Sequence, residues 1–183
     1  MAYAGKQLFS AHAGQQIRFI KTSADTGGEL LVMESAWQPF SRRPPLHYHP
    51  QQDELFTVLD GRLTILSGDK KHVLQAGDEF HIPAGTVHAM WNAHEEPVKV
   101  RWEVRPAMET EFMLEQAMGL SKEGKVSATG MPHIIDALHL VRTYRREFRL
   151  AKPTWWIQKM VFNLVAPINY FNGAAFRMKK YVD

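Results

Sequence analysis

The stretch Pro45-Leu46-His47-Tyr48-His49-Pro50-Gln51-Gln52-Asp53-Glu54 decides the fold. Residues two apart on a β-strand point to the same side, so His47 and His49 present both imidazoles to one space. Pro50 and the polar residues after it do not continue a central strand easily, and the chain is predicted to turn there. Glu54 then opens the next strand, predicted to lie beside the first, and brings a carboxylate towards the two imidazoles. Such a donor set favours Mn, Fe, Co, Ni, Cu or Zn over Ca or Mg.

A second informative stretch is Gly77-Asp78-Glu79-Phe80-His81-Ile82-Pro83-Ala84-Gly85-Thr86-Val87-His88-Ala89-Met90-Trp91-Asn92. It predicts a strand, a Pro-Ala-Gly turn and another strand. His88, Met90 and Asn92 share one face of the later strand. With that face inside, His88 becomes a fourth ligand, and Met90 and Asn92 line the pocket beside it.

These two stretches resemble the two sequence motifs of the cupin superfamily. The first pattern, His-x-His-x4-Glu-x6-Gly, is filled by His47, His49, Glu54 and Gly61. The second, Gly-x5-Pro-x-Gly-x2-His-x3-Asn, is filled by Gly77, Pro83, Gly85, His88 and Asn92. A cupin usually has glycine where this chain has Ser41, a departure that affects loop geometry and not ligation. The resemblance covers about residues 29–104 in one copy.

The resemblance implies a mainly β fold, a single jelly-roll (cupin) β-barrel, followed here by a C-terminal α-helical extension. We expect the barrel domain over residues 1–106 and the helical extension over residues 107–183. The cofactor implied is one divalent transition metal (Fe, Mn, Ni, Cu, Co or Zn), with His47, His49, Glu54 and His88 as its ligands. Many cupins are homodimers, so a homodimer is expected.

Helical periodicity appears after Pro106. Apolar spacing predicts helices over Glu109–Leu120 and through Ile134, Leu138, Val141, Arg145 and Phe148. A last helix is predicted over Thr154–Val165, with Pro167 stopping or kinking it.

Inward positions near the predicted metal are largely apolar. Phe56, Met90 and Trp102 are expected to line a substrate pocket together with Asn92, whereas Lys99, Arg101 and Arg105 alternate to the outside. Such a pocket favours an aromatic or other apolar molecule over a sugar or a small dicarboxylate.

Composition sets outer limits on the function. The 183 residues include no cysteine, so disulfides and thiolate metal sites are excluded. The first residues lack the basic start and apolar run of a secretory signal, and a cytoplasmic location is the expectation. The chain carries a net charge of +3.

The positive charge lies in the tail, where residues 142–180 hold nine basic side chains and one acidic one. Together with the Trp-rich segment that begins at Trp155, this pattern is compatible with contact to an anionic membrane surface. Packing of the 142–180 segment on the barrel or on a partner subunit is the favoured alternative. Nucleic-acid binding is not expected, because no reading module accompanies the arginines.

Three functions follow from the motifs. The first is a metal-dependent enzyme, with a dioxygenase-like oxidoreductase preferred, in which Glu54 is a ligand that also serves as a catalytic base. The second is a small-ligand-binding or sensing module without turnover. The third is a sugar isomerase or epimerase-like cupin. A small molecule is the expected ligand or substrate in all three.

Overall fold

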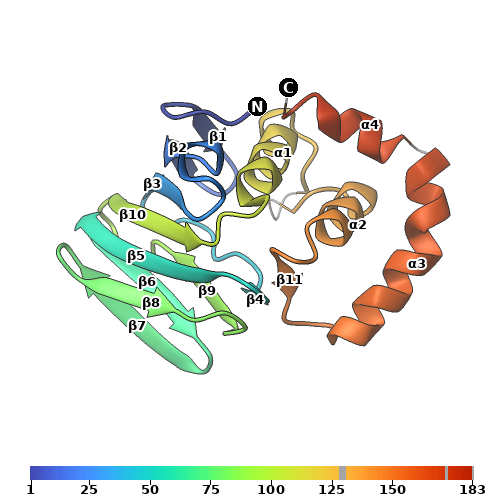
Figure 1. Ribbon diagram of the computed structural model, residues 1–183. Coiled ribbons are helices and arrows are strands. Elements are labelled where there is room, and N and C mark those ends of the chain that lie inside the picture. The colour runs from blue at the N-terminus through green and yellow to red at the C-terminus, as the bar shows by residue number, and fades with distance from the viewer. Residues whose placement is uncertain (128–130, 172, 183) are drawn as a thin grey trace.

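Two antiparallel β-sheets face each other in the computed structural model, which describes residues 1–127, 131–171 and 173–182 (Figure 1). The larger sheet has the strand order β1 (Gln7–Ser10), β2 (Gln15–Lys21), β3 (Leu31–Trp37), β10 (Val98–Arg105), β5 (Asp53–Asp60) and β8 (Glu79–Ile82). The smaller sheet has the order β11 (Arg149–Leu150), β4 (His47–Tyr48), β9 (His88–Trp91), β6 (Arg62–Ser67) and β7 (Lys70–Gln75). A short 3₁₀ helix, η1 (Ala24–Thr26), separates β2 from β3.

The arrangement confirms the predicted jelly-roll. Among the described strands, none pairs across the two sheets, so the barrel is a sandwich of facing sheets and not a closed cylinder. One detail of the prediction is wrong: β5, which carries Glu54, does not lie beside β4. The chain crosses to the opposite sheet between these strands, because β5 finds its backbone partners in β10 and β8.

Alternation along the strands fills the space between the sheets. In β10 the side chains of Val98, Val100, Trp102 and Val104 are buried, whereas Lys99, Arg101 and Arg105 are exposed as predicted. Burial of such apolar area is the main favourable term in folding. The core between the sheets includes the fully buried side chains of Ile17, Phe19, Met33, Phe56, Leu63 and Ile65.

Helix α1 (Thr110–Lys122) begins close to the predicted position and packs against β1. The buried Gln52 amide fixes its start, donating hydrogen bonds to the carbonyl oxygens of Pro106 and Ala107 and to Thr110 Oγ1. Further along the helix, the Glu111 carboxylate accepts hydrogen bonds from the backbone N–H and hydroxyl of Ser23. The helix is therefore attached to the barrel by buried polar contacts as well as by apolar ones.

Helix α2 (Ile134–Thr143) is shorter than predicted. The predicted helical stripe through Arg145 and Phe148 is wrong, because the chain leaves the helix after residue 143 and forms β11. Arg149 and Leu150 pair with Tyr48 and His47 of β4. Hydrogen bonds to a strand far away in the sequence thus replace the last turn of the helix.

The last two helices, α3 (Trp155–Phe171) and α4 (Ala174–Lys179), return the chain to α1 (Figure 1). Met178 on α4 is buried in a cluster with Leu120, Leu140 and Tyr144, so this part of the tail packs within its own chain.

Helix α3 runs across Pro167 and does not stop there. Three large apolar residues of this helix are exposed to solvent, with exposed fractions of 64% for Trp156, 56% for Met160 and 74% for Leu164. No helix among the described residues has the length and apolar character needed to cross a membrane.

The turn after β5 supplies a test of the fold. Gly61 has φ +76°, and a Cβ added there would lie 2.2 Å from the carbonyl oxygen of Pro97. We expect Gly61→Ala to lower the free energy of unfolding by about 2–3 kcal/mol through strain and overlap, measured by chemical denaturation. Gly68→Ala is the control, because Gly68 also has positive φ (+56°) but faces open space. Equal losses in the two variants would contradict the close approach at Gly61.

Candidate metal centre

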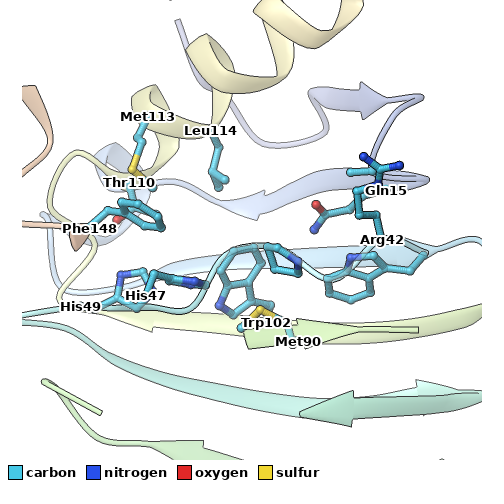
Figure 2. Close-up of a pocket in the computed structure, with 13 residues that line it drawn as sticks. Gln15, Arg42, His47, His49, Met90, Trp102, Thr110, Met113, Leu114 and Phe148 are labelled. Atoms are coloured by element: carbon cyan, nitrogen blue, oxygen red, sulfur yellow. The ribbon is translucent and has the colours of Figure 1, made fainter. Parts of the chain in front are cut away.

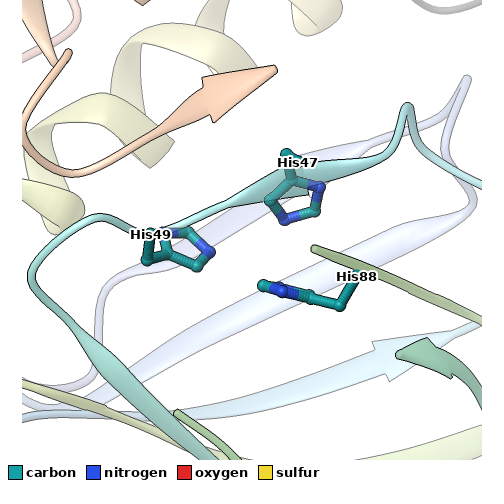
Figure 3. A group of neighbouring side chains, drawn as sticks. All are labelled: His47, His49 and His88. Carbon is teal, nitrogen blue, oxygen red and sulfur yellow. The ribbon is translucent and has the colours of Figure 1, made fainter. Parts of the chain in front are cut away.

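Three histidines meet between the two sheets (Figure 3). His47 lies on β4 directly opposite His88, the first residue of β9, and His49 follows β4. All three side chains are buried, and one ring nitrogen of each lies within 4.8 Å of the others. The strand period of two explains the pair His47 and His49, and the β4–β9 pairing adds His88. The structure therefore brings together the three histidines that the motifs single out.

Each imidazole is oriented by a backbone carbonyl behind it. Nδ1 of His47 lies 2.9 Å from the Pro45 oxygen, and Nδ1 of His88 lies 2.8 Å from the Thr86 oxygen. Nδ1 of His49 lies 2.6 Å from the Glu147 oxygen. A carbonyl oxygen only accepts, so each Nδ1 carries a proton, and in the neutral ring each Nε2 keeps its lone pair. This backing is typical of metal-ligating histidines.

Glu54 reaches the same point from the opposite sheet. Its Oε2 lies 2.8 Å from Nε2 of His88 and 3.4 Å from Nε2 of His49. Its other oxygen, Oε1, accepts a hydrogen bond of 3.0 Å from the indole N–H of Trp102. The carboxylate is thereby held with one oxygen towards the histidines. The predicted fourth donor is thus beside the other three, although its strand lies in the facing sheet.

The nitrogen and oxygen atoms that face one another at this point, and that could bind a metal, lack hydrogen bonds. Within the described part of the chain, His49 Nε2, His88 Nε2 and Glu54 Oε2 are buried and have no hydrogen-bond partner. When the rings are neutral, these three atoms all carry lone pairs, and buried lone pairs at 2.8–3.4 Å repel unless a cation or proton lies between them. Three imidazole nitrogens and one carboxylate oxygen fit a divalent first-row transition ion.

Burial and mutual proximity set the protonation states. Burial, reinforced by the neighbouring imidazoles of His88 and His49, lowers the pKa of His47 to about 3. Burial alone raises the pKa of Glu54, but the surrounding histidines outweigh it and lower that pKa to about 2. Burial opposes protonation of His88 too, yet the adjacent Glu54 carboxylate raises its pKa. Near neutral pH the centre therefore holds a carboxylate and a neutral His47, which are the ligand forms that a metal requires.

Two residues of the C-terminal extension complete the centre. Besides the Glu147 carbonyl behind His49, the ring of Phe148 stacks on His47 with centroids 4.8 Å apart and planes at 25°. The pairing of β11 with β4 places both residues here. Sequence reasoning missed them, because a backbone carbonyl has no side-chain signature and Phe148 continued a helical stripe. The one available signal was Pro153, which precludes a single helix running from α2 into the last helical segment.

An apolar cavity of about 160 Å³ opens beside the histidines (Figure 2). His47 and His49 form its polar end, and Met90 and Trp102 line it as predicted. Most of the remaining wall is apolar, with Thr110, Gln15 and Arg42 as its other polar residues. The further apolar lining comes from Ala13, Trp37, Pro44, Met113, Leu114 and Phe148.

Phe56 and Asn92 do not line this cavity. Phe56 is fully buried and stacks on Trp102 with ring centroids 5.6 Å apart, so it supports the wall from behind. The Asn92 side-chain amide donates to the backbone oxygens of Gln38 and Glu96, and its side-chain oxygen accepts from His94 N–H. Asn92 therefore holds the loops at the end of β9 together. His81 points outward and lies 3.3 Å from Asp53.

The fold and the centre define a jelly-roll protein with a buried nitrogen and oxygen donor set. Residues 34–104 match the sequence model of the cupin domain. Together with the two motifs and the observed topology, this match shows that the chain contains a cupin domain.

Similarity to known protein sequences is local. The chain is 34% identical over 77 residues to quercetin 2,3-dioxygenase of Bacillus subtilis, covering 42% of this chain and 23% of that protein. It is 56% identical over 43 residues to the uncharacterized protein YdbB of the same organism, covering 23% of this chain and 38% of that protein. The chain thus spans well under half the length of these relatives. Among solved structures, KdgF from Halomonas sp. matches with a TM-score of 0.49 and 17% identity, over 57% of this chain and 89% of that chain.

The contact of Phe148 with His47 gives a testable link between tail and barrel. We expect Phe148→Ala to lower the free energy of unfolding by about 2 kcal/mol, less than the 3–5 kcal/mol of a fully buried phenylalanine, because the side chain is half-buried. Phe148→Leu keeps apolar volume and is expected to lose less than about 1.5 kcal/mol. Denaturant titration of both variants measures the difference. An alanine variant as stable as the wild type would show that β11 is not held on the barrel by this ring.

Proposed function

We propose that this protein is a metal-dependent cupin enzyme that acts on a small apolar or aromatic molecule, with oxygenation of an enolic or aromatic substrate as its reaction. The observation that carries the proposal is the set of buried, unpartnered atoms of His49, His88 and Glu54, next to an apolar cavity that His47 and His49 line. His47 belongs to the same cluster of three buried histidines. The local similarity to quercetin 2,3-dioxygenase supports the oxygenase assignment.

The bound ion would supply Lewis-acid or redox chemistry at this point. His47, His49 and His88 would hold it through Nε2, with their Nδ1 protons anchored on backbone oxygens. Glu54 would be the fourth ligand and, when released from the ion, a base for an acidic hydroxyl of the substrate. Trp102 positions this carboxylate through its indole N–H. The apolar walls exclude water and orient a flat or aliphatic substrate.

A ligand-sensing module is the second candidate. It is favoured by one specific feature, the backing of His49 by a carbonyl of the C-terminal extension. Occupancy of the centre is thereby linked to docking of the tail. In this alternative the barrel closes over the ligand without turnover, and the tail transmits the change.

Metal content is the first test of the ligand set. We expect His49→Ala to reduce the metal content of the purified protein severalfold or more, because one nitrogen donor is lost and no other side chain replaces it. Elemental analysis by mass spectrometry provides the measurement. His81→Ala is the matched control, because His81 is exposed and its ring lies beside Asp53. The metal content of this variant is expected to equal that of the wild type. Unchanged content in His49→Ala would remove His49 from the ligand set.

Turnover separates the two candidate functions. We expect the metal-loaded protein to consume O2 in the presence of catechols, flavonols or diketones, and Glu54→Gln to lose most of this activity because the base and the anionic ligand are both removed. An oxygen electrode and product analysis by mass spectrometry give the readout. Thermal stabilisation by the same compounds without O2 uptake or product would instead support the sensing module.

A further inference from the structure

A second cavity lies behind the first, between α1 and α2. Its volume is about 230 Å³, and α1 contributes Met113, Leu114 and Ala117 to its wall. Helix α2 contributes Ala137, Leu140 and Val141. The remaining lining residues are Pro45, Met131, Pro132, Phe148 and Leu150. All eleven side chains are nonpolar, so this chamber offers a ligand apolar contact and no side-chain hydrogen bond.

The two cavities share part of their walls. Phe148, Met113 and Leu114 line both, so these three side chains form a partition between the chamber and the space beside His47 and His49 (Figure 2). Met113 is unbranched and flexible, and Leu114 and Phe148 are half-buried. Small rotations of such side chains suffice to join the two spaces.

Volume and chemistry suggest that the cavities act as one site. Ligand pockets typically start at about 300 Å³, and each cavity alone is smaller than this. Taken together the two reach that range. One end of the joined space is lined by the imidazoles of His47 and His49, and the chamber at the other end is wholly apolar.

We propose that the two cavities form a single binding site for an amphipathic small molecule. Its metal-chelating head group would lie at His47, His49 and His88, and its aliphatic or alkyl-aromatic tail would pass the side chain of Met113 into the chamber between α1 and α2. The proposal rests on the proposed metal centre and narrows its substrate class to molecules with an extended apolar tail. A compact substrate such as a small dicarboxylate leaves the chamber without an occupant.

The first experiment uses the whole wild-type protein loaded with Zn²⁺, which does not support redox turnover. Straight-chain alkyl hydroxamic acids, from acetohydroxamic to octanohydroxamic acid, are titrated by isothermal calorimetry. We expect affinity to rise about fourfold for each methylene that enters the chamber, from the transfer free energy of about 0.8 kcal/mol per buried CH₂. The rise is expected to level off once the tail fills the chamber.

A plugging variant locates the tail. Ala137→Phe places a ring in the chamber, and we expect it to abolish the gain from octanohydroxamic over acetohydroxamic acid while leaving acetohydroxamic binding unchanged. Ala117→Leu is a milder plug from the opposite wall, used where the larger substitution impairs folding. Thr143→Phe is the matched control, because it adds an aromatic ring to an exposed position of the same α2 and is expected to keep the full chain-length dependence.

The outcomes separate this inference from the function on which it rests. One outcome is that acetohydroxamic acid binds every variant with wild-type affinity, while longer alkyl chains add no affinity. That result would overturn the proposal that the chamber binds the tail, and it would leave the proposed metal centre intact. Chain-length dependence that survives both plugs would place the tail elsewhere and also overturn it. Failure of acetohydroxamic acid to bind, combined with a gain from longer chains that the plugs remove, would support the chamber and contradict the metal centre as its head-group site.

Discussion

The convergence of buried lone pairs between the two sheets is the constraint on which the rest of the site depends. His49, His88 and Glu54 point acceptor atoms at one another where no hydrogen-bond donor of the described chain reaches them. Burying such groups without a partner is unfavourable. The protein nevertheless fixes them in this arrangement, with backbone oxygens behind the rings and the Trp102 indole behind the carboxylate. A rigid set of such acceptors is compatible with a bound metal ion.

The part of this site that depends on strand periodicity is predictable from the sequence. A His-x-His pair on one strand projects to one face, and the spacing to Glu54 and His88 matches a known pair of motifs. The sequence predicts that the strand of Glu54 lies beside the strand of His47, whereas β5 lies in the sheet opposite β4. The prediction of proximity still holds, because the inward faces of two facing sheets meet just as adjacent strands do. Hydrophobic alternation does not reveal which strands pair.

The alternation of side chains along a strand predicts which residues point inward, but it does not predict how far each one lies from the cavity. Phe56 shares an inward face with Glu54, as expected, but it lies two residues further into the sandwich, where Trp102 covers it. Asn92 follows the end of β9, and its hydrogen bonds go to loop carbonyls instead of the cavity. Met90 and Trp102 do line the cavity, together with His47 and His49. Distance along the barrel axis depends on register and sheet twist, which no local pattern in a single sequence specifies.

The contribution of the C-terminal extension was the least predictable feature and changes how the domains are to be understood. Residues 107–183 are predicted to form a helical extension that packs on the barrel or on a partner subunit, whereas β11 joins the smaller sheet beside β4. Its neighbours Glu147 and Phe148 hold His49 and His47 in place. Docking of β11 and its neighbours holds the imidazoles of His47 and His49 in the orientations that a bound cation would also favour. Thermodynamic linkage then requires that each of the two events favours the other. An ion that prefers the oriented imidazoles must stabilise the docked tail by the same free energy by which the tail strengthens ion binding.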